Sequence, residues 1–216
     1  MSRKICQLAV LLMCSTVVAC SAHKESAEPV VYRDASKNAN SVVYKDKNTT
    51  NDSQWMIDKE AALRESIAGT PFTLRKQGNA LVVTVQADQS FNPVRPAFLL
   101  PVSLRPITKM AKLLQANPDS AVLILGHTDM SASDKDNYEL SSNRARAVAS
   151  IFRLSGLSGQ RMSHFGLGGS HLLPAQKIAK NNHRVEIIVT QHAEFQDVMA
   201  GYKPAHVRQL ALSQGQ

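Results

Sequence analysis

Residues 121–125 form a continuous apolar run of strand length, and long stretches with helical spacing lie on either side of it in the sequence. The first stretch covers residues 99–116 and ends at Asn117-Pro118, because proline cannot continue a helix. The second covers residues 137–154 and ends before Gly156. A fully apolar strand is stable only when other elements bury it, so this pattern predicts helices packed on a sheet.

The remaining periodic segments supply the other strands and two further helices. They are, in order, a short amphipathic helix over 57–68, a hairpin over 72–85, strands over 162–167 and 184–190, and a small helix over 193–199 before a frayed tail. From the end of the hairpin onward the order is strand, helix, strand, helix, strand, strand. We therefore predict an α/β (α+β) sandwich in which the helices pack on one mixed sheet.

The first twenty residues have the pattern of an export signal. A short basic start precedes an almost wholly apolar stretch over residues 5–18, which is too short for a final membrane-spanning anchor. Residues 17–20, Val-Val-Ala-Cys, resemble a bacterial lipobox. That resemblance implies cleavage before Cys20 and attachment of acyl chains to this cysteine. The alternative is an ordinary signal peptide with an incidental cysteine.

Cysteine usage and the residue after Cys20 refine this prediction. The three cysteines are Cys6, Cys14 and Cys20, so cleavage would leave Cys20 alone and no intramolecular disulfide. In Gram-negative lipoproteins an aspartate after the cysteine favours the inner membrane. Here that residue is Ser21, so the resemblance implies the outer membrane, with the domain facing the periplasm. The formal net charge of +8 suggests nucleic acid as a partner, but the export signal argues against it.

Residues 21–53 are polar and balanced in charge, and they show no sustained helical or strand periodicity. Such a composition is typical of a disordered tether. A flexible coil of about 33 residues spans roughly 30 Å on average and reaches about 110 Å when extended. The tether would therefore hold a domain well away from a membrane surface.

The most informative stretch follows the apolar run. Gly126-His127-Thr128-Asp129 leaves the strand, and Asn137, Leu140, Ser141 and Arg144 open the next helix. Further matching positions are Phe91 after an earlier strand, Gly166, Gly168 and Pro174 in a turn, and Arg184-Val185-Glu186-Ile187 in the last strand. Their order closely resembles the peptidoglycan-binding domain of the outer-membrane-protein-A (OmpA) family, shared by peptidoglycan-associated lipoproteins. The resemblance covers residues 60–190 and is more specific than one short motif.

The export pattern, the composition and this resemblance together suggest five parts of the chain. They are a signal peptide (1–19), a lipidated tether (20–54), a helix and hairpin lead-in (55–79), an OmpA-like domain (80–192) and a C-terminal tail (193–216).

The resemblance also implies a ligand, the diaminopimelate of the peptidoglycan stem peptide. Its free centre carries an ammonium beside a carboxylate. Asp129 is expected to bind the ammonium, and Arg144 to form a bidentate pair with the carboxylate. The helix start near Asn137 is expected to add positive potential and free N–H groups. The other residues expected to line or shape the site are Thr128, Phe91, Asn137 and Leu140.

Spacing alone leaves an alternative in which Asp129 and Arg144 pair with each other and brace the fold. The neighbouring residues are interpreted as structural or solvated: His127 as a buried, hydrogen-bonded core residue, Ser141 as bonding local backbone, and Arg153, Arg161 and Lys177 as solvated. Two features depart from the family. His183 stands where the first of two paired arginines is usual, with Arg184 as the second, and the span from 174 to 184 is short. Both departures lie near the edge of the binding groove that the resemblance implies, where they are expected to affect affinity or ligand choice.

These observations predict a non-catalytic outer-membrane lipoprotein that binds peptidoglycan and tethers the outer membrane to the cell wall. The alternative is a lipoprotein subunit of an envelope assembly, such as a secretion-system outer-membrane complex, with protein partners. An enzyme is disfavoured because the chain has no Gly-x-Ser-x-Gly turn and no convincing pair of acid/base carboxylates. No cofactor is expected, and the histidines lack the spacing of a zinc site.

Overall fold

The computed structural model describes residues 51–173 and 180–215 of the chain. The predicted signal peptide, Cys20 and nearly all of the predicted tether lie outside these residues, as do Pro174 and Lys177. None of the helices in the described ranges has the length and apolar character needed to cross a bilayer.

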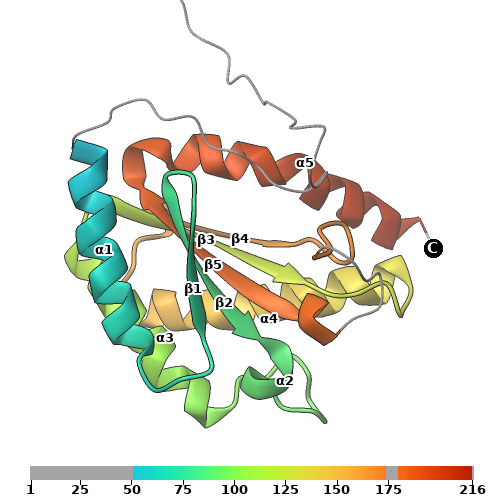
Figure 1. Cartoon of the computed structure of the whole chain (residues 1–216). Coiled ribbons are helices and arrows are strands. Elements are labelled where there is room, and N and C mark those ends of the chain that lie inside the picture. The colour runs from blue at the N-terminus through green and yellow to red at the C-terminus, as the bar shows by residue number, and fades with distance from the viewer. Residues whose placement is uncertain (1–50, 174–179, 216) are drawn as a thin grey trace, which may run out of the picture. The chain divides into compact units, whose positions relative to one another are not determined.

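One five-stranded sheet forms the centre of the domain, with strand order β1-β2-β5-β3-β4 (Figure 1). The strands are β1 (Thr73–Gln77), β2 (Ala80–Gln86), β3 (Ser120–His127), β4 (Met162–Gly166) and β5 (Arg184–Gln191). Only β3 and β4 run parallel to each other, and the other neighbouring strands are antiparallel. A parallel pair needs a long crossover connection, and a helix provides it here. The predicted mixed sheet is confirmed.

The helices also match the predicted stretches in most cases. They are α1 (Asn51–Ile67), the short α2 (Ala87–Ser90), α3 (Pro101–Ala116), α4 (Asp134–Leu154) and α5 (Phe195–Gln214). Single 3₁₀ turns are η1 (Gly159–Arg161), η2 (Lys180–Asn182) and η3 (His192–Glu194). α1 begins at Asn51, earlier than residue 57, where the apolar spacing predicted the helix to begin.

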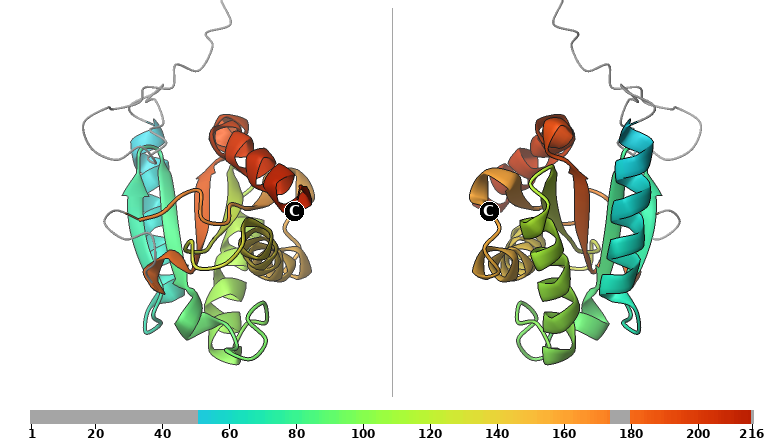
Figure 2. Two further views of the ribbon diagram at one scale, coloured as in Figure 1. Left: turned by 90° about the vertical axis from the view of Figure 1, so that its right-hand side faces the viewer. Right: turned by 90° about the vertical axis from the view of Figure 1, so that its left-hand side faces the viewer.

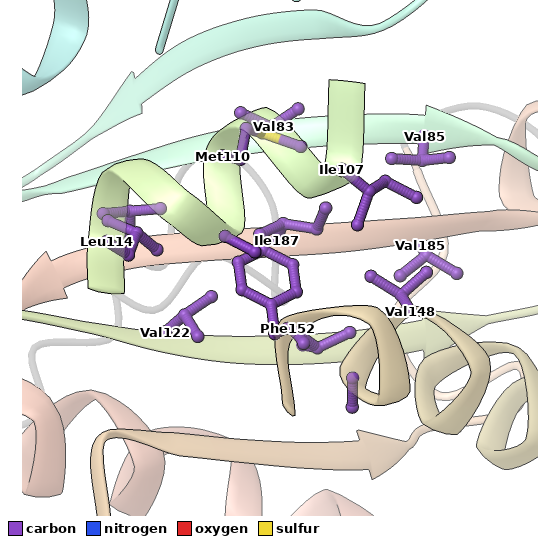
Figure 3. Packing of buried hydrophobic residues seen from close by; sticks show 14 of the residues in the cluster. Val83, Val85, Ile107, Met110, Leu114, Val122, Val148, Phe152, Val185 and Ile187 are labelled. Carbon is purple, nitrogen blue, oxygen red and sulfur yellow. The ribbon is translucent and has the colours of Figure 1, made fainter. Parts of the chain in front are cut away.

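The larger core fills the space between one face of the sheet and helices α1, α3 and α4. Figure 3 shows the part of it between the sheet and helices α3 and α4. Alternate residues of β2, β3 and β5 point into it, as the period of two in a strand requires. Met110 of α3 and Phe152 of α4 are fully buried against them. Trp55 and Leu63 of α1 belong to the same cluster, so the helix before the hairpin shares this core.

The opposite face of the sheet is covered by α5, which runs along it from Phe195 to Gln214 (Figure 2). The other set of alternate strand residues, including Leu123 and Ile188, packs against Phe195, Val198 and Tyr202. The prediction of a short helix over 193–199 and a frayed tail was therefore wrong. Local sequence disfavours a long helix here because it contains Gly201 and Pro204, and burial on the sheet compensates.

Tyr202→Ala is expected to lower the free energy of unfolding by about 2–4 kcal/mol, because it opens a cavity between α5 and the sheet. Val207→Ala provides the control, since Val207 is exposed on the same helix and should cost less than about 0.5 kcal/mol. Urea unfolding of both variants measures the difference. If Tyr202→Ala and Val207→Ala unfold at the same urea concentration, the packing of α5 on the sheet does not stabilise the folded domain.

The end of β3 approaches α4 closely at Gly126. A methyl group at this position would overlap the backbone carbonyl of Ser141, because only hydrogen separates the strand from the helix. Gly166, at the end of β4, also lies close to α4, since an added methyl group would be 2.8 Å from Ser142. The residues that leave β3 therefore lie directly beside the first turns of α4.

Gly126→Ala is expected to lower the free energy of unfolding by at least about 3 kcal/mol, because the methyl group meets backbone that cannot rotate away. Gly159→Ala is the matched control, since no atom lies within 4 Å of the added methyl group. Thermal unfolding compares them. If Gly126→Ala has the same melting temperature as the wild type, β3 and α4 do not approach each other as closely at Gly126 as described.

Candidate functional site

The loop after β3 is fixed to the end of β4 by backbone hydrogen bonds. Leu167 donates its N–H to the carbonyl of Gly126 at 2.9 Å, and Thr128 donates to the carbonyl of Gly168 at 3.0 Å. The Gly168 N–H donates in turn to the hydroxyl of Ser141 on α4, at 3.0 Å. Asp129 thus leaves the carboxyl end of β3 on a loop held from both sides.

Asp129 carries a buried carboxylate, with only 4% of the residue exposed. Its Oδ1 accepts hydrogen bonds from the backbone N–H of Ser131 at 2.9 Å and from the Ser131 hydroxyl at 2.5 Å. Burial raises the pKa of this carboxyl, but the bonds from Ser131 and the nearby His183 outweigh it and hold the pKa below its ordinary value. Asp129 is therefore an anion at neutral pH.

Arg144 projects from α4, one turn beyond Ser141, and is 7% exposed. Its Nε donates to the carbonyl of Pro96 at 2.8 Å, and its guanidinium carbon lies 5.4 Å from the centre of the Phe91 ring. Burial lowers the pKa of Arg144 to about 10. Even so, the side chain remains charged at neutral pH.

In the described part of the chain, no carboxylate lies within ion-pair distance of Arg144, and its buried Nη1 has no hydrogen-bond acceptor. The alternative in which Asp129 and Arg144 pair with each other does not describe this arrangement. A buried guanidinium without a counter-ion is costly, because its desolvation is not offset by a partner. The domain thus carries a desolvated cation and a buried anion near each other without a direct bond between them.

His183 is the residue that faces both charges. Its Nε2 lies 3.5 Å from Asp129 Oδ1. Burial lowers the pKa of His183; Asp129 raises it and Arg144 lowers it, and the net effect is a pKa below 6.5. The resemblance placed His183 near the expected edge of the groove as a departure from paired arginines, but its contact with Asp129 was not predicted.

The other predicted site residues have several different surroundings. Phe91 is buried beneath the guanidinium of Arg144. Thr128 is fully buried, and its hydroxyl has no hydrogen-bond partner among the described residues. Asn137 is buried and donates its side-chain amide to the carbonyl of Ala132 at 2.9 Å, which braces the loop. Leu140 is half-buried on α4.

The helix start differs from the expectation for Asn137. α4 begins at Asp134, and Ser133 caps it by accepting a hydrogen bond from the N–H of Asp136 at 3.1 Å. The Asn137 N–H donates to the carbonyl of Ser133 at 2.9 Å. The prediction of free N–H groups for a ligand at Asn137 was therefore wrong, because local capping determines the first turn.

Arg184 and His127, at two neighbouring strand ends of the sheet, are structural. Arg184 donates from Nε to Glu186 at 2.9 Å, and its other nitrogens reach the carbonyls of Asn182 and His171. His127 is buried as predicted, but neither ring nitrogen has a hydrogen-bond partner among the described residues. Burial, followed by the charge of Arg184, lowers the pKa of His127 well below 6.5, so this ring is neutral.

Arg161, expected to be solvated, instead donates to three backbone carbonyls. They belong to Leu114, Asn117 and Ser120, at 2.8–3.0 Å. This prediction was wrong because the tertiary fold brings the end of α3 and the start of β3 to the η1 turn. Ser141 bonds the carbonyl of Tyr138, as predicted.

Comparison with known proteins identifies the domain that carries these charges. The OmpA family matches residues 100–186, which include β3, α4 and β4. The chain carries a domain of the OmpA family. "Probable lipoprotein YiaD" of Escherichia coli is 29% identical over 139 residues, or 63% of this chain and 63% of that protein. "Peptidoglycan-binding protein ArfA" of Mycobacterium tuberculosis is 33% identical over 96 residues, or 43% of this chain and 29% of that protein.

The chain spans less than two thirds of the length of these relatives. Among solved structures, a putative MotB-like protein from Desulfovibrio vulgaris gives a TM-score of 0.53 at 19% identity. That likeness covers 65% of this chain and 91% of the other, and it shows a shared fold.

Arg144→Met is expected to leave the free energy of unfolding unchanged or to raise it by up to about 2 kcal/mol, because the substitution removes a desolvated charge that has no counter-ion. An arginine in a structural ion pair would instead cost about 3–5 kcal/mol on removal of one partner. Arg161→Met is the control: it leaves three carbonyls without their donor, so we expect a clear loss of stability. Urea unfolding at pH 7 distinguishes the cases. A loss above about 3 kcal/mol for Arg144→Met would mean that Arg144 braces the fold.

Proposed function

We propose that this protein is a non-catalytic outer-membrane lipoprotein that binds the diaminopimelate-containing stem peptide of peptidoglycan and tethers the outer membrane to the cell wall. The observation that carries the proposal is Arg144, a buried cation with no carboxylate partner in the described part of the chain. Its free Nη1 and the ionised Asp129 offer one positive and one negative group. That pair complements a zwitterion.

The diaminopimelate centre fits these two charges in a defined direction. Its ammonium is assigned to Asp129, whose second oxygen is not used by Ser131. Its carboxylate is assigned to Arg144, which the Pro96 carbonyl and the Phe91 ring hold in place. Charge-assisted bonds contribute about 1.5–3 kcal/mol each before desolvation is subtracted, so these two contacts alone support a roughly millimolar affinity for a single stem.

Two features of the chain would strengthen the attachment of the membrane to the wall beyond the affinity of one domain for one stem peptide. Acyl chains on Cys20 would hold the protein to the membrane, since each buried CH2 contributes about 0.8 kcal/mol. The polar residues 21–53 would let the domain reach the wall. Many stems then lie within range of each anchored domain, so avidity raises the effective affinity without new contacts. The names of the relatives, a lipoprotein and a peptidoglycan-binding protein, agree with this proposal.

The proposal predicts that unlipidated protein, residues 21–216, pellets with purified sacculi of the diaminopimelate type. Asp129→Asn and Arg144→Met should each weaken the apparent affinity at least tenfold, because each loses a charge-assisted bond. Asp119→Asn and Arg153→Met are matched controls, since they make the same charge changes at exposed positions before β3 and near the end of α4. They should bind as the wild type does.

Two conditions separate this site from general adhesion of a basic protein. Binding should persist at moderate salt, which screens exposed charges. Sacculi with lysine in place of diaminopimelate lack the zwitterionic centre, so they should bind at least tenfold more weakly. Equal binding to both sacculi would refute diaminopimelate recognition. Folded wild-type protein that remains in the supernatant throughout would refute wall binding and favour a search for protein partners in the envelope.

A further inference from the structure

The backbone and surroundings of His183 hold its side chain at the edge of the Asp129–Arg144 site. Its N–H donates to the carbonyl of Lys180 at 3.0 Å, and its carbonyl accepts from Ala87 at 2.9 Å. The side chain is 29% exposed, and its buried Nδ1 has no hydrogen-bond partner among the described residues. The ring is therefore placed by the start of β5, with its Nε2 directed at the same Asp129 oxygen that Ser131 holds.

We propose that His183 is a third binding residue whose neutral form permits strong binding of an ammonium–carboxylate ligand, so that acidification weakens the grip. This inference rests on the proposed function of the site.

Charge balance explains the direction of the effect. With His183 neutral, the site presents one anion, Asp129, and one cation, Arg144, and their sum matches a zwitterion. With His183 protonated, its Nε2–H pairs with Asp129 Oδ1, and a ligand ammonium at the other oxygen would have to share the carboxylate with a cation that the protein itself supplies. The site then carries a net positive charge, which favours a ligand that brings a carboxylate without an ammonium.

Asp129 and Arg144 are the charged groups of the described residues whose fields act on His183, one from the β3–α4 loop and one from α4. Burial, the largest influence, and Arg144 disfavour the imidazolium, whereas Asp129 favours it, so the pKa of His183 lies below 6.5. The ring is therefore neutral at pH 7.5, and it gains a proton as the pH falls toward its pKa. Asp129 stays ionised there because its own pKa is lowered.

Linkage gives a second consequence. A bound ammonium beside Asp129 would lower the pKa of His183 further, since two cations would compete for one carboxylate. Ligand binding near the pKa of His183 must then release protons, by the same coupling through which protons weaken ligand binding.

The test uses protein residues 21–216 and the soluble stem tripeptide L-alanyl-γ-D-glutamyl-meso-diaminopimelate, with calorimetry at pH 7.5, 6.5 and 5.5. Wild-type affinity is expected to fall at least fivefold from pH 7.5 to 5.5. His183→Asn, which cannot take a proton, should change less than twofold over the same range. His192→Asn should keep the wild-type dependence, because His192 is exposed in η3, beyond the far end of β5.

Proton release is measured near pH 6 in two buffers with different ionisation enthalpies. Release by the wild type that is lost in His183→Asn supports the proposal. A wild-type affinity independent of pH, or an unchanged pH dependence in His183→Asn, overturns it while leaving the proposed ligand intact. Absence of tripeptide and sacculus binding at every pH would instead overturn the proposed function. If His183→Asn does not fold, NMR titration of the wild-type imidazole decides: an unchanged pKa on ligand addition refutes the proposal.

Discussion

The close approach of β3 to α4 at Gly126 is the contact on which the site depends. Because no side chain separates the strand from the Ser141 carbonyl, the loop leaving β3 and the first turns of α4 share one edge of the sheet. The same helix residue, through its hydroxyl, holds Gly168, whose carbonyl in turn holds Thr128. Asp129 and Arg144 are thus placed by backbone contacts, which vary far less than contacts between flexible side chains.

The domain uses its buried and half-buried arginines in two different ways. Arg161 and Arg184 have several acceptors each, and they join segments that are distant in the sequence. Arg144 has one backbone acceptor and an aromatic ring beneath it, with one buried nitrogen left without a partner. Stability would favour an apolar side chain at such a position. Retaining a desolvated charge suits a residue that receives its counter-ion from a ligand, and proteins often accept such a cost at functional sites.

α5 links the far side of the sheet to the same edge. Its Tyr202 and Val198 cover the second core, and further along the helix the side chain of Gln209 lies against Gly168. His206 of α5 stacks on Phe165 of β4 with ring centres 4.7 Å apart. The loop that carries Asp129 is therefore supported through Gly168 by α4 on one face and by α5 on the other.

The apolar run at 121–125 and the helical spacing around it were enough to predict the mixed sheet, α3 and α4, because burial periodicity is a local property of the sequence. The charges of Asp129 and Arg144 could likewise be singled out from their order along the chain. Only the tertiary structure decided that these two residues do not pair and that His183 is close enough to feel the charge of both. It also decided that Arg161 donates to three carbonyls and that the last residues form a long helix. Each of these depends on which distant segments meet and how far water is excluded from them, and neither quantity is encoded in the spacing of neighbouring residues.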